Sequence, residues 1–177
     1  TWKVTDAGKF FVSLDISSAN FTAMRYHDPA LLLNAPVYQE LVKTFTPSLW
    51  MRKSKTLRQV IFSELHWQGQ SRIIRFIIHS ITQVLLTQCG VPEERFHSIN
   101  NDEILIHTSE ADWQQDVDTW ARALSEQLPE IRDNIKLEVY SIFHLAPKPY
   151  FVKELRFTHR LGAQPPDVQA VDGSVQE

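Results

Sequence analysis

The chain has 177 residues, of which 43% are hydrophobic and 22% charged, and this is the balance of a globular protein with room for one domain and a sizeable core. Its single cysteine, Cys89, excludes an internal disulfide framework and a cysteine zinc site, and it favours a reducing, intracellular compartment. The net charge of −3 resides in the tail from Leu161 on, which holds three acids and no Lys or Arg, so the preceding body is neutral. Bulk charge therefore does not indicate a nucleic-acid-binding protein, and only a local cluster of bases could do so.

The first third of the chain predicts one strand followed by short helices. The apolar run "KFFVSLDI" (9–16) predicts a buried strand, and the segment after it predicts a short helical turn and a loop around Asp28. Asn34 as an N-cap, with Pro36 in the first turn, predicts the start of a short helix, and "SKTLRQVIFSEL" (54–65) predicts another.

A longer helix is predicted from Ser71, acting as its N-cap, to about Gln88, with Gly90 ending it. Its apolar residues follow helical spacing, so one face is expected in the core: Ile74, Ile77, Ile78, Ile81, Val84 and Leu85. Arg75 and His79 interrupt the apolar run "RIIRFIIHSITQVLL", so we expect no membrane-spanning segment.

The stretch "RFHSINNDEILIHT" predicts a tight β-hairpin with arms at about 95–99 and 103–107. Ser109 and Asp112 then resemble a capping box and predict a helix that Pro129 ends. The apolar stripe of this helix is expected in the core: Trp113, Val117, Trp120 and Leu124.

Two further strands are predicted at 134–146 and 150–157. The element order predicts an α+β fold of ferredoxin-like type, βαββαβ plus an extra strand, with an antiparallel sheet and helices on one face. We expect one domain over 1–160, with a small helical insertion at about 34–70, and a disordered acidic tail at 161–177.

Three carboxylates are expected to meet at one edge of this sheet. Asp15 ends the first strand, and Asp102 and Glu103 follow the tip of the hairpin that a ferredoxin-like sheet places beside it. Without a counter-charge these groups would repel one another and their pKa values would rise. Hard cations such as Mg²⁺ relieve that repulsion, and two such ions can support phosphoryl transfer.

Two segments resemble the metal-binding motifs of the palm-domain polymerase and nucleotidyltransferase superfamily. "FVSLDISSANFTAMR" is similar to the first palm motif of family A DNA polymerases: Asp15 and Ser17 match its D-x-S-x-x-E pattern, and Asn20 stands in place of Glu. "SINNDEILIHT" is similar to the second motif, H-D-E, in which Asp102 and Glu103 match.

The resemblance stops at the superfamily. The interval from Asp15 to Asp102 is much shorter than in family A and is closer to that of translesion polymerases and reverse transcriptases. The Asp-Glu hairpin is also similar to those of diguanylate cyclases and reverse-direction tRNA nucleotidyltransferases, although cyclases have two glycines where this chain has Asn100 and Asn101.

The resemblance implies a two-metal enzyme that adds nucleotides to a DNA or RNA end. Asp15 and Asp102 would hold Mg²⁺ or Mn²⁺, Glu103 would assist them, and Phe21 would lie against the sugar of a nucleoside triphosphate. A cluster of bases between the motifs would bind the triphosphate: Arg52, Lys53, Lys55 and Arg58. Because the chain has no room for full fingers and thumb, other chains would supply them.

Several other interpretations of these residues remain open. Asp102 and Glu103 could form a solvated turn, Asp15 could cap the turn after its strand, and the bases could lie on a solvated helix face. The chain would then be an inactive palm or a ferredoxin-like module that binds RNA or a protein within a larger assembly. Tyr140 and Phe143 could contact RNA, but their spacing puts them on opposite faces of a strand. The seven histidines show no H-x-E or H-E-x-x-H spacing, so the sequence predicts no zinc site.

Overall fold

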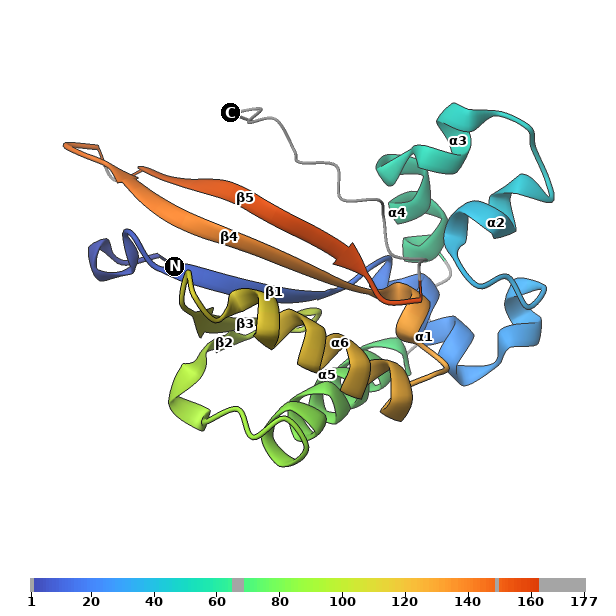
Figure 1. Ribbon diagram of the computed structural model, residues 1–177. Coiled ribbons are helices and arrows are strands. Elements are labelled where there is room, and N and C mark those ends of the chain that lie inside the picture. The colour runs from blue at the N-terminus through green and yellow to red at the C-terminus, as the bar shows by residue number, and fades with distance from the viewer. Residues whose placement is uncertain (1, 65–68, 149, 163–177) are drawn as a thin grey trace.

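A five-stranded antiparallel sheet forms the centre of a mixed α+β fold in the computed structural model, which describes residues 2–64, 69–148 and 150–162 (Figure 1). The strands lie in the order β2-β3-β1-β4-β5. Their bounds are β1 Phe10–Ile16, β2 Phe96–Ile99, β3 Glu103–Thr108, β4 Ile135–Leu145 and β5 Tyr150–Arg160. The α-helices are α1 Ala19–His27, α2 Tyr38–Lys43, α3 Leu49–Lys53, α4 Lys55–Glu64, α5 Gln70–Thr87 and α6 Trp113–Gln127. Short 3₁₀ turns are η1 Val4–Asp6, η2 Pro29–Leu32, η3 Glu93–Arg95 and η4 Arg132–Asn134.

Strand β1 occupies the middle of the sheet and pairs on both sides. Its ladder with β3 ends at Asp15 opposite Glu103, and its ladder with β4 places Asp15 opposite Lys136. Residues directly opposite in an antiparallel ladder project from the same face, so these three side chains share one face of the sheet. Strand pairing thus brings residues far apart in the sequence to one end of β1.

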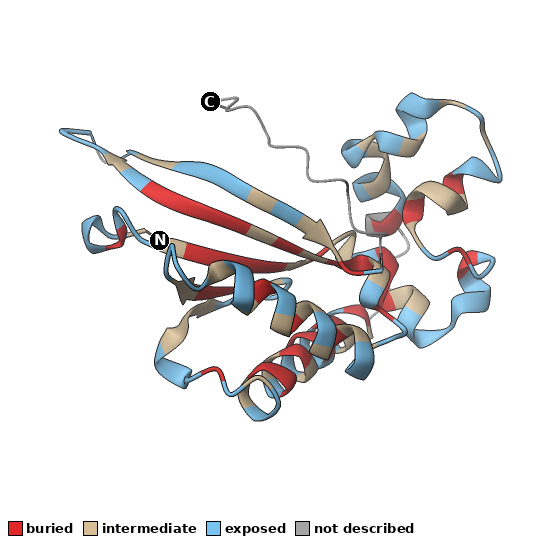
Figure 2. Cartoon of the chain, viewed as in Figure 1, coloured by how far each residue is buried: buried red, intermediate tan, exposed pale blue. Residues whose placement is uncertain are grey.

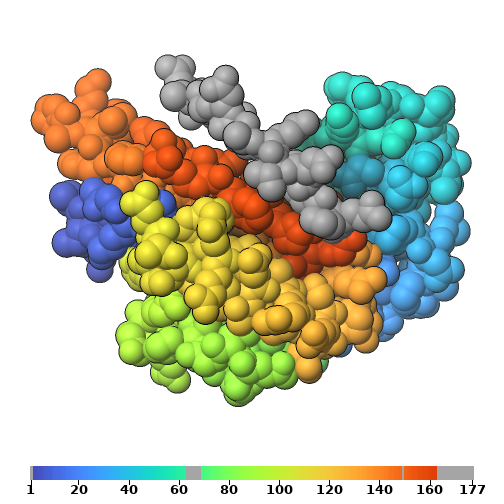
Figure 3. All heavy atoms as spheres, in the orientation of Figure 1, coloured from blue at the N-terminus to red at the C-terminus, as the bar shows by residue number. Residues whose placement is uncertain are grey.

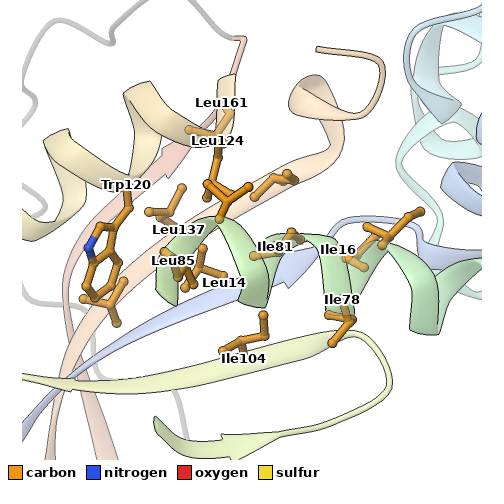
Figure 4. Packing of buried hydrophobic residues seen from close by; sticks show 14 of the residues in the cluster. Leu14, Ile16, Ile78, Ile81, Leu85, Ile104, Trp120, Leu124, Leu137 and Leu161 are labelled. Carbon is orange, nitrogen blue, oxygen red and sulfur yellow. The ribbon is translucent and has the colours of Figure 1, made fainter. Parts of the chain in front are cut away.

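Helices α5 and α6 cover the other face of the sheet (Figure 1). The buried side chains of α5 and α6 pack against alternate residues of β1, β3 and β4, and Figure 4 shows Ile81 and Leu85 of α5 and Trp120 of α6 meeting Leu14 and Leu137 of the sheet. Burial follows the predicted helical stripes, since Val117, Trp120 and Leu124 are all buried and Trp113 packs at the margin. The predicted antiparallel sheet with helices on one face is confirmed at this level.

Helix starts were predicted less well than helix faces. Asn34 does not cap a helix: it has a left-handed backbone, and α2 begins four residues later, after Val37. Ser71 lies inside α5, which begins at Gln70 after Gly69. The pair Ser109 and Asp112 does form, because the Asp112 N–H and side chain both contact the Ser109 hydroxyl just before α6.

Helices α2, α3 and α4 form a small lobe beside the sheet, within the predicted insertion at 34–70 (Figures 1 and 3). The sequence predicted two of these helices and missed α3. The lobe has its own small core, in which Phe21 from α1 packs with Tyr38 and Phe62. Most of its outer surface is exposed, as the blue segments of Figure 2 show. The lobe is therefore attached to the sheet through α1.

The folded body extends past residue 160. Leu161 is 1% exposed, packs in the main core, and donates its N–H to the carbonyl of Ile135. Leu161 therefore does not belong to the predicted tail, and the rest of that prediction, on residues 163–177, lies outside the described part of the chain. Among the described residues, no helix combines the length and the apolar character needed to cross a membrane.

Two isoleucines that face each other in the hairpin provide a matched test of this core. Ile104 of β3 is fully buried, whereas its partner Ile99 of β2 is 50% exposed. We expect Ile104→Ala to lower the free energy of unfolding by about 2–5 kcal/mol, because it leaves a cavity under α5. Ile99→Ala should cost about 1 kcal/mol or less. Urea denaturation of both variants measures the difference, and equal losses would contradict this packing.

Candidate active site

The hairpin turn that carries Asp102 is held directly to the end of β1. The N–H of Ile16, next to Asp15, donates to the carbonyl of Asp102 at 2.8 Å. The N–H of Asn100 donates to the carbonyl of Glu103 at 2.8 Å and closes the turn. The backbone of the turn thus has a defined position relative to Asp15, while the Asp102 side chain stays exposed.

Glu103 lies opposite Asp15 and is held by β1 itself. Its Oε1 accepts a hydrogen bond from the Ser13 hydroxyl at 2.6 Å, and Ser13 is buried at 1% exposure. This bond orients one oxygen of the carboxylate along the sheet surface. A carboxylate has two oxygens, so the second can still accept a hydrogen bond or bind a metal ion.

The electrostatic environment of Asp15 is unfavourable for a carboxylate. Burial raises the pKa of Asp15, the ammonium group of Lys136 opposes that rise, and the charges of Asp102 and Glu103 add to it. Lys136 Nζ also lies 2.7 Å from Glu138 Oε1, so its positive charge is shared between Glu138 and Asp15. A divalent cation would relieve the repulsion among the three carboxylates, but in the described part of the chain they do not form a group whose ligand atoms all lie within 4.8 Å of one another.

A hollow of about 330 Å³ opens beside Asp15 and Asp102. Lys55 and Arg58 of α4 line the same hollow, so strand-end acids and helical cations face one space. The remaining lining residues include Phe21, Phe62, Gln59 and the start of α1. The arrangement can accept a ligand that carries both a metal ion and anionic groups.

The N-terminus of α1 also opens onto this hollow. Ser18 precedes the helix with a left-handed backbone (φ 55°), and its side chain makes no capping hydrogen bond to the described residues. Ala19 and Asn20, in the first turn, line the hollow. Uncapped first-turn N–H groups and the positive end of the helix dipole favour an anion there.

The structure places the other predicted residues as follows. Arg52 and Lys53 lie on α3 and are not among the described residues lining the hollow. Arg58 lies over the Tyr38 ring, with its guanidinium carbon 5.7 Å from the ring centroid. Phe21 is fully buried and packs edge-to-face with Phe62, so it is both a wall of the hollow and part of the core of the lobe. The structure therefore divides the predicted basic cluster, and only its C-terminal half faces the acids.

Sequence reasoning missed Lys136 and the open N-terminus of α1. Lys136 is the second residue of β4, and only the ladder between β1 and β4 assigns it to Asp15. The sequence did contain a signal for α1: Ser17 and Ser18 separate a strand from a helix in the way that first-turn N–H groups are often presented. Neither feature belongs to a recognisable sequence motif.

A second hollow, of about 520 Å³, lies between α5 and the hairpin turn. Arg75, His79 and Thr82 line it from α5, and Asn100 and Asn101 line it from the turn. It adjoins the turn that carries Asp102, but no carboxylate is among the described residues that line it. We therefore take the first hollow as the candidate active site.

No protein-family model, no curated protein and no solved structure matches this chain. The candidate site is therefore argued from its own geometry.

Removing the charge of Asp15 should stabilise the fold near neutral pH. A raised folded-state pKa means that Asp15 contributes stability below its ordinary pKa of 3.8, and this contribution is lost as the pH rises through the folded-state pKa. Asp15→Asn mimics the protonated form, so we expect it to raise the free energy of unfolding by about 0.5–2 kcal/mol at pH 7. The gain should shrink as the pH falls.

Urea titrations at pH 4 and pH 7 measure this effect. The exposed Asp118 on α6 provides the control, since Asp118→Asn should change little at either pH. Millimolar Mg²⁺ should stabilise the wild type more than Asp15→Asn. A loss of stability in Asp15→Asn at pH 7 would show that the carboxylate serves the fold and is not held there against repulsion.

Proposed function

We propose that this chain is a palm-like nucleotidyltransferase domain that adds nucleotides to a nucleic-acid end with Mg²⁺ or Mn²⁺. The observation that carries the proposal is the single hollow lined by Asp15 and Asp102 on one side and by Lys55 and Arg58 on the other. Nucleoside triphosphates reach enzymes as complexes with Mg²⁺, and they need oxygen ligands for the metal and cations for the phosphates. The hollow offers both.

The strand order supports a ferredoxin-like assignment within this proposal. Order β2-β3-β1-β4 with antiparallel neighbours is what a βαββαβ chain forms when α5 and α6 cover one face, and β5 adds an outer strand. The fold alone gives no activity. It supports the proposal because it sets a strand end and a hairpin turn side by side.

Asp15 and Asp102 are the proposed metal ligands, and Glu103 is the proposed third member. The hydrogen bond from Ser13 fixes Glu103 on the sheet, where it can hold a metal-bound water or one metal position. When bound, Mg²⁺ supplies Lewis-acid stabilisation of the charge that develops on the reacting phosphate. The chain itself contributes the positions of the carboxylates, and burial beside two other carboxylates raises the pKa of Asp15, a cost of ionisation that a bound cation would offset.

The triphosphate is proposed to lie between the start of α1 and the helix α4. Ala19 and Asn20 of the first turn of α1 line the hollow together with Lys55 and Arg58 of α4, and first-turn N–H groups favour an anion. Phe21 borders the hollow but is 0% exposed, so it supports the wall of the hollow without offering a surface on which the sugar could rest. In the reaction a hydroxyl oxygen of the nucleic-acid end bonds to the α-phosphorus of a nucleoside triphosphate, the bond from that phosphorus to the β-phosphate breaks, pyrophosphate leaves, and the hydroxyl proton passes to solvent.

The lobe of α2–α4 is small, so we propose that partner chains complete the grip on the nucleic acid. Phe45, Leu49 and Trp50 are 74%, 57% and 72% exposed on the lobe. Large apolar side chains exposed together often mark contact surfaces.

A non-catalytic binding module is the second candidate. The observation in its favour is the β4–β5 arm, which extends away from the helices (Figure 1) and exposes Phe143, Leu145 and Tyr150. Such an arm suits a protein partner. Loss of the acids should leave a module of this kind unaffected, whereas it should abolish the enzyme.

Metal-dependent binding of a nucleoside triphosphate tests the proposal. We expect calorimetry with Mn²⁺ and a nonhydrolysable ATP analogue to show one site in the wild type, and neither Asp15→Ala nor Asp102→Ala to bind measurably. Asp118→Ala is the matched control on α6 and should bind normally. Circular dichroism verifies that each variant is folded. A wild type that binds no triphosphate would favour the binding module, and primer-extension assays follow a positive result.

The two halves of the basic cluster should behave differently. Lys55→Ala and Arg58→Ala should each weaken triphosphate binding roughly 10–100-fold, since a hydrogen bond to a charged group contributes about 1.5–3 kcal/mol. Lys53→Ala, two positions from Lys55 but outside the lining of the hollow, should change it less than about threefold. Equal losses in Lys53→Ala and Lys55→Ala would place the phosphates on α3 instead.

A further inference from the structure

A second group of possible metal ligands lies away from the hollow that Asp15 and Asp102 line. Asp6 of η1, His97 of β2 and His107 of β3 each offer a ligand atom, and these atoms all lie within 4.8 Å of one another. Nδ1 of His97 and Nε2 of His107 are 3.3 Å apart. His107 stands near the opposite end of β3 from Glu103. The group is therefore separate from the proposed active site.

A register shift in the hairpin turns His97 toward His107. Phe96 pairs with Ile106 and Ser98 pairs with Leu105, so His97 is the extra residue of a β-bulge. Bulges re-aim side chains and recur beside functional sites. The two imidazole rings meet edge to face, with ring centroids 5.2 Å apart and an interplanar angle of 84°.

The spacing fits a tetrahedral first-row metal ion. Zinc–nitrogen bonds of about 2.0–2.1 Å at tetrahedral angles put two ligand nitrogens about 3.3–3.4 Å apart. The two histidine nitrogens already have this separation. The carboxylate of Asp6 completes a set of two imidazoles and one oxygen, which leaves a fourth position for water.

Neighbouring groups hold these three side chains in place. Trp2 stacks on His97 with ring centroids 5.3 Å apart, and the ring centroids of Phe11 and His107 are 4.5 Å apart. The backbone N–H of Lys3 donates to Asp6 Oδ2 at 2.8 Å and so orients the carboxylate, which is 4% exposed. Oriented outer contacts of this kind typically accompany metal ligands.

The ion pair that Asp6 already makes does not prevent metal binding. Lys9 Nζ lies 3.7 Å from Asp6 Oδ1, and metal binding would replace this partly exposed ion pair. Such a pair contributes little, so its loss is a small cost.

We propose that Asp6, His97 and His107 bind one divalent transition-metal ion, with Zn²⁺ as the best fit. The imidazoles select such an ion over Mg²⁺, which prefers an all-oxygen site. The bound ion links the N-terminal turn η1 to both strands of the hairpin. It stabilises the edge of the sheet at β2, a strand of four residues.

Metal titration of the full chain tests this proposal. After chelator treatment, we expect Co²⁺ to give the intense visible absorption of a tetrahedral site at one equivalent, and Zn²⁺ to displace it and raise the thermal midpoint. His97→Ala and His107→Ala should each weaken Zn²⁺ binding by more than about 100-fold, because loss of an outer contact alone costs about 10–100-fold. Asp6→Asn should weaken it less.

Two controls separate this site from other sites on the chain. His79→Ala, an exposed histidine on α5, should bind Zn²⁺ as the wild type does. The Asp15→Ala, Asp102→Ala double variant should also keep Zn²⁺ binding, so failure of the proposed active site leaves this result intact. His97→Gln, which keeps much of the ring volume, replaces His97→Ala if the alanine variant does not fold. The proposal is overturned if the wild type binds no Zn²⁺ or if folded His97 and His107 variants bind it unchanged.

Discussion

Strand β1 forms ladders with β3 on one side and with β4 on the other, and both ladders reach Asp15. Because side chains alternate along a strand, a slip of one residue in either ladder would turn Leu14 out of the helix-covered core and turn Asp15 into it. Burial of Leu14 under α5 and α6 thus specifies the same register that sets Asp15 opposite Glu103 and Lys136. Core packing and the position of the acids are consequences of one constraint, and a chain that keeps this core keeps the acids together.

The environment of Asp15 argues against the simplest reading of the hairpin acids. A turn that carries Asp and Glu for solubility would expose both and leave the strand beside it apolar to its end. Here Asp15 is half-buried next to two further carboxylates, and burial raises its pKa. Lys136 offsets part of this cost but is shared with Glu138. Arrangements that oppose folding persist where a ligand uses them, and the hollow shared with Lys55 and Arg58 offers such a ligand a place.

The sequence predicted the periodic parts of this structure well and the local details poorly. Strand β1, the hairpin and the apolar faces of α5 and α6 have strong periods of two or about 3.6, and burial selects those periods directly. Asn34 failed as a cap because it belongs to the turn that ends η2, where its backbone is left-handed and its N–H donates to the carbonyl of Pro29. The site followed the same division. Asp15 and Asp102 could be paired from element order. Strand registers and helix orientations, which no short motif encodes, determine the other details: the split of the basic cluster between α3 and α4, the role of Lys136 and the bulge at His97.

The two proposed metal sites share one hairpin and differ in ligand chemistry. Near the turn the ligands are carboxylates, which suit Mg²⁺, and toward the other end of the arms they are imidazoles, which suit Zn²⁺. This separation allows each site to select its own ion in a mixture of both. The shared hairpin also couples the two proposed sites mechanically. Strand β2 is a short edge strand with an irregular register, and the turn after it presents Asp102. An ion that ties His97 of β2 to His107 of β3 and to Asp6 opposes fraying of that edge. Since the carbonyl of Asp102 accepts the N–H of Ile16 beside Asp15, a firmer hairpin keeps Asp102 in reach of Asp15. Zinc at one end of the hairpin would thereby support the geometry on which magnesium binding at the other end depends.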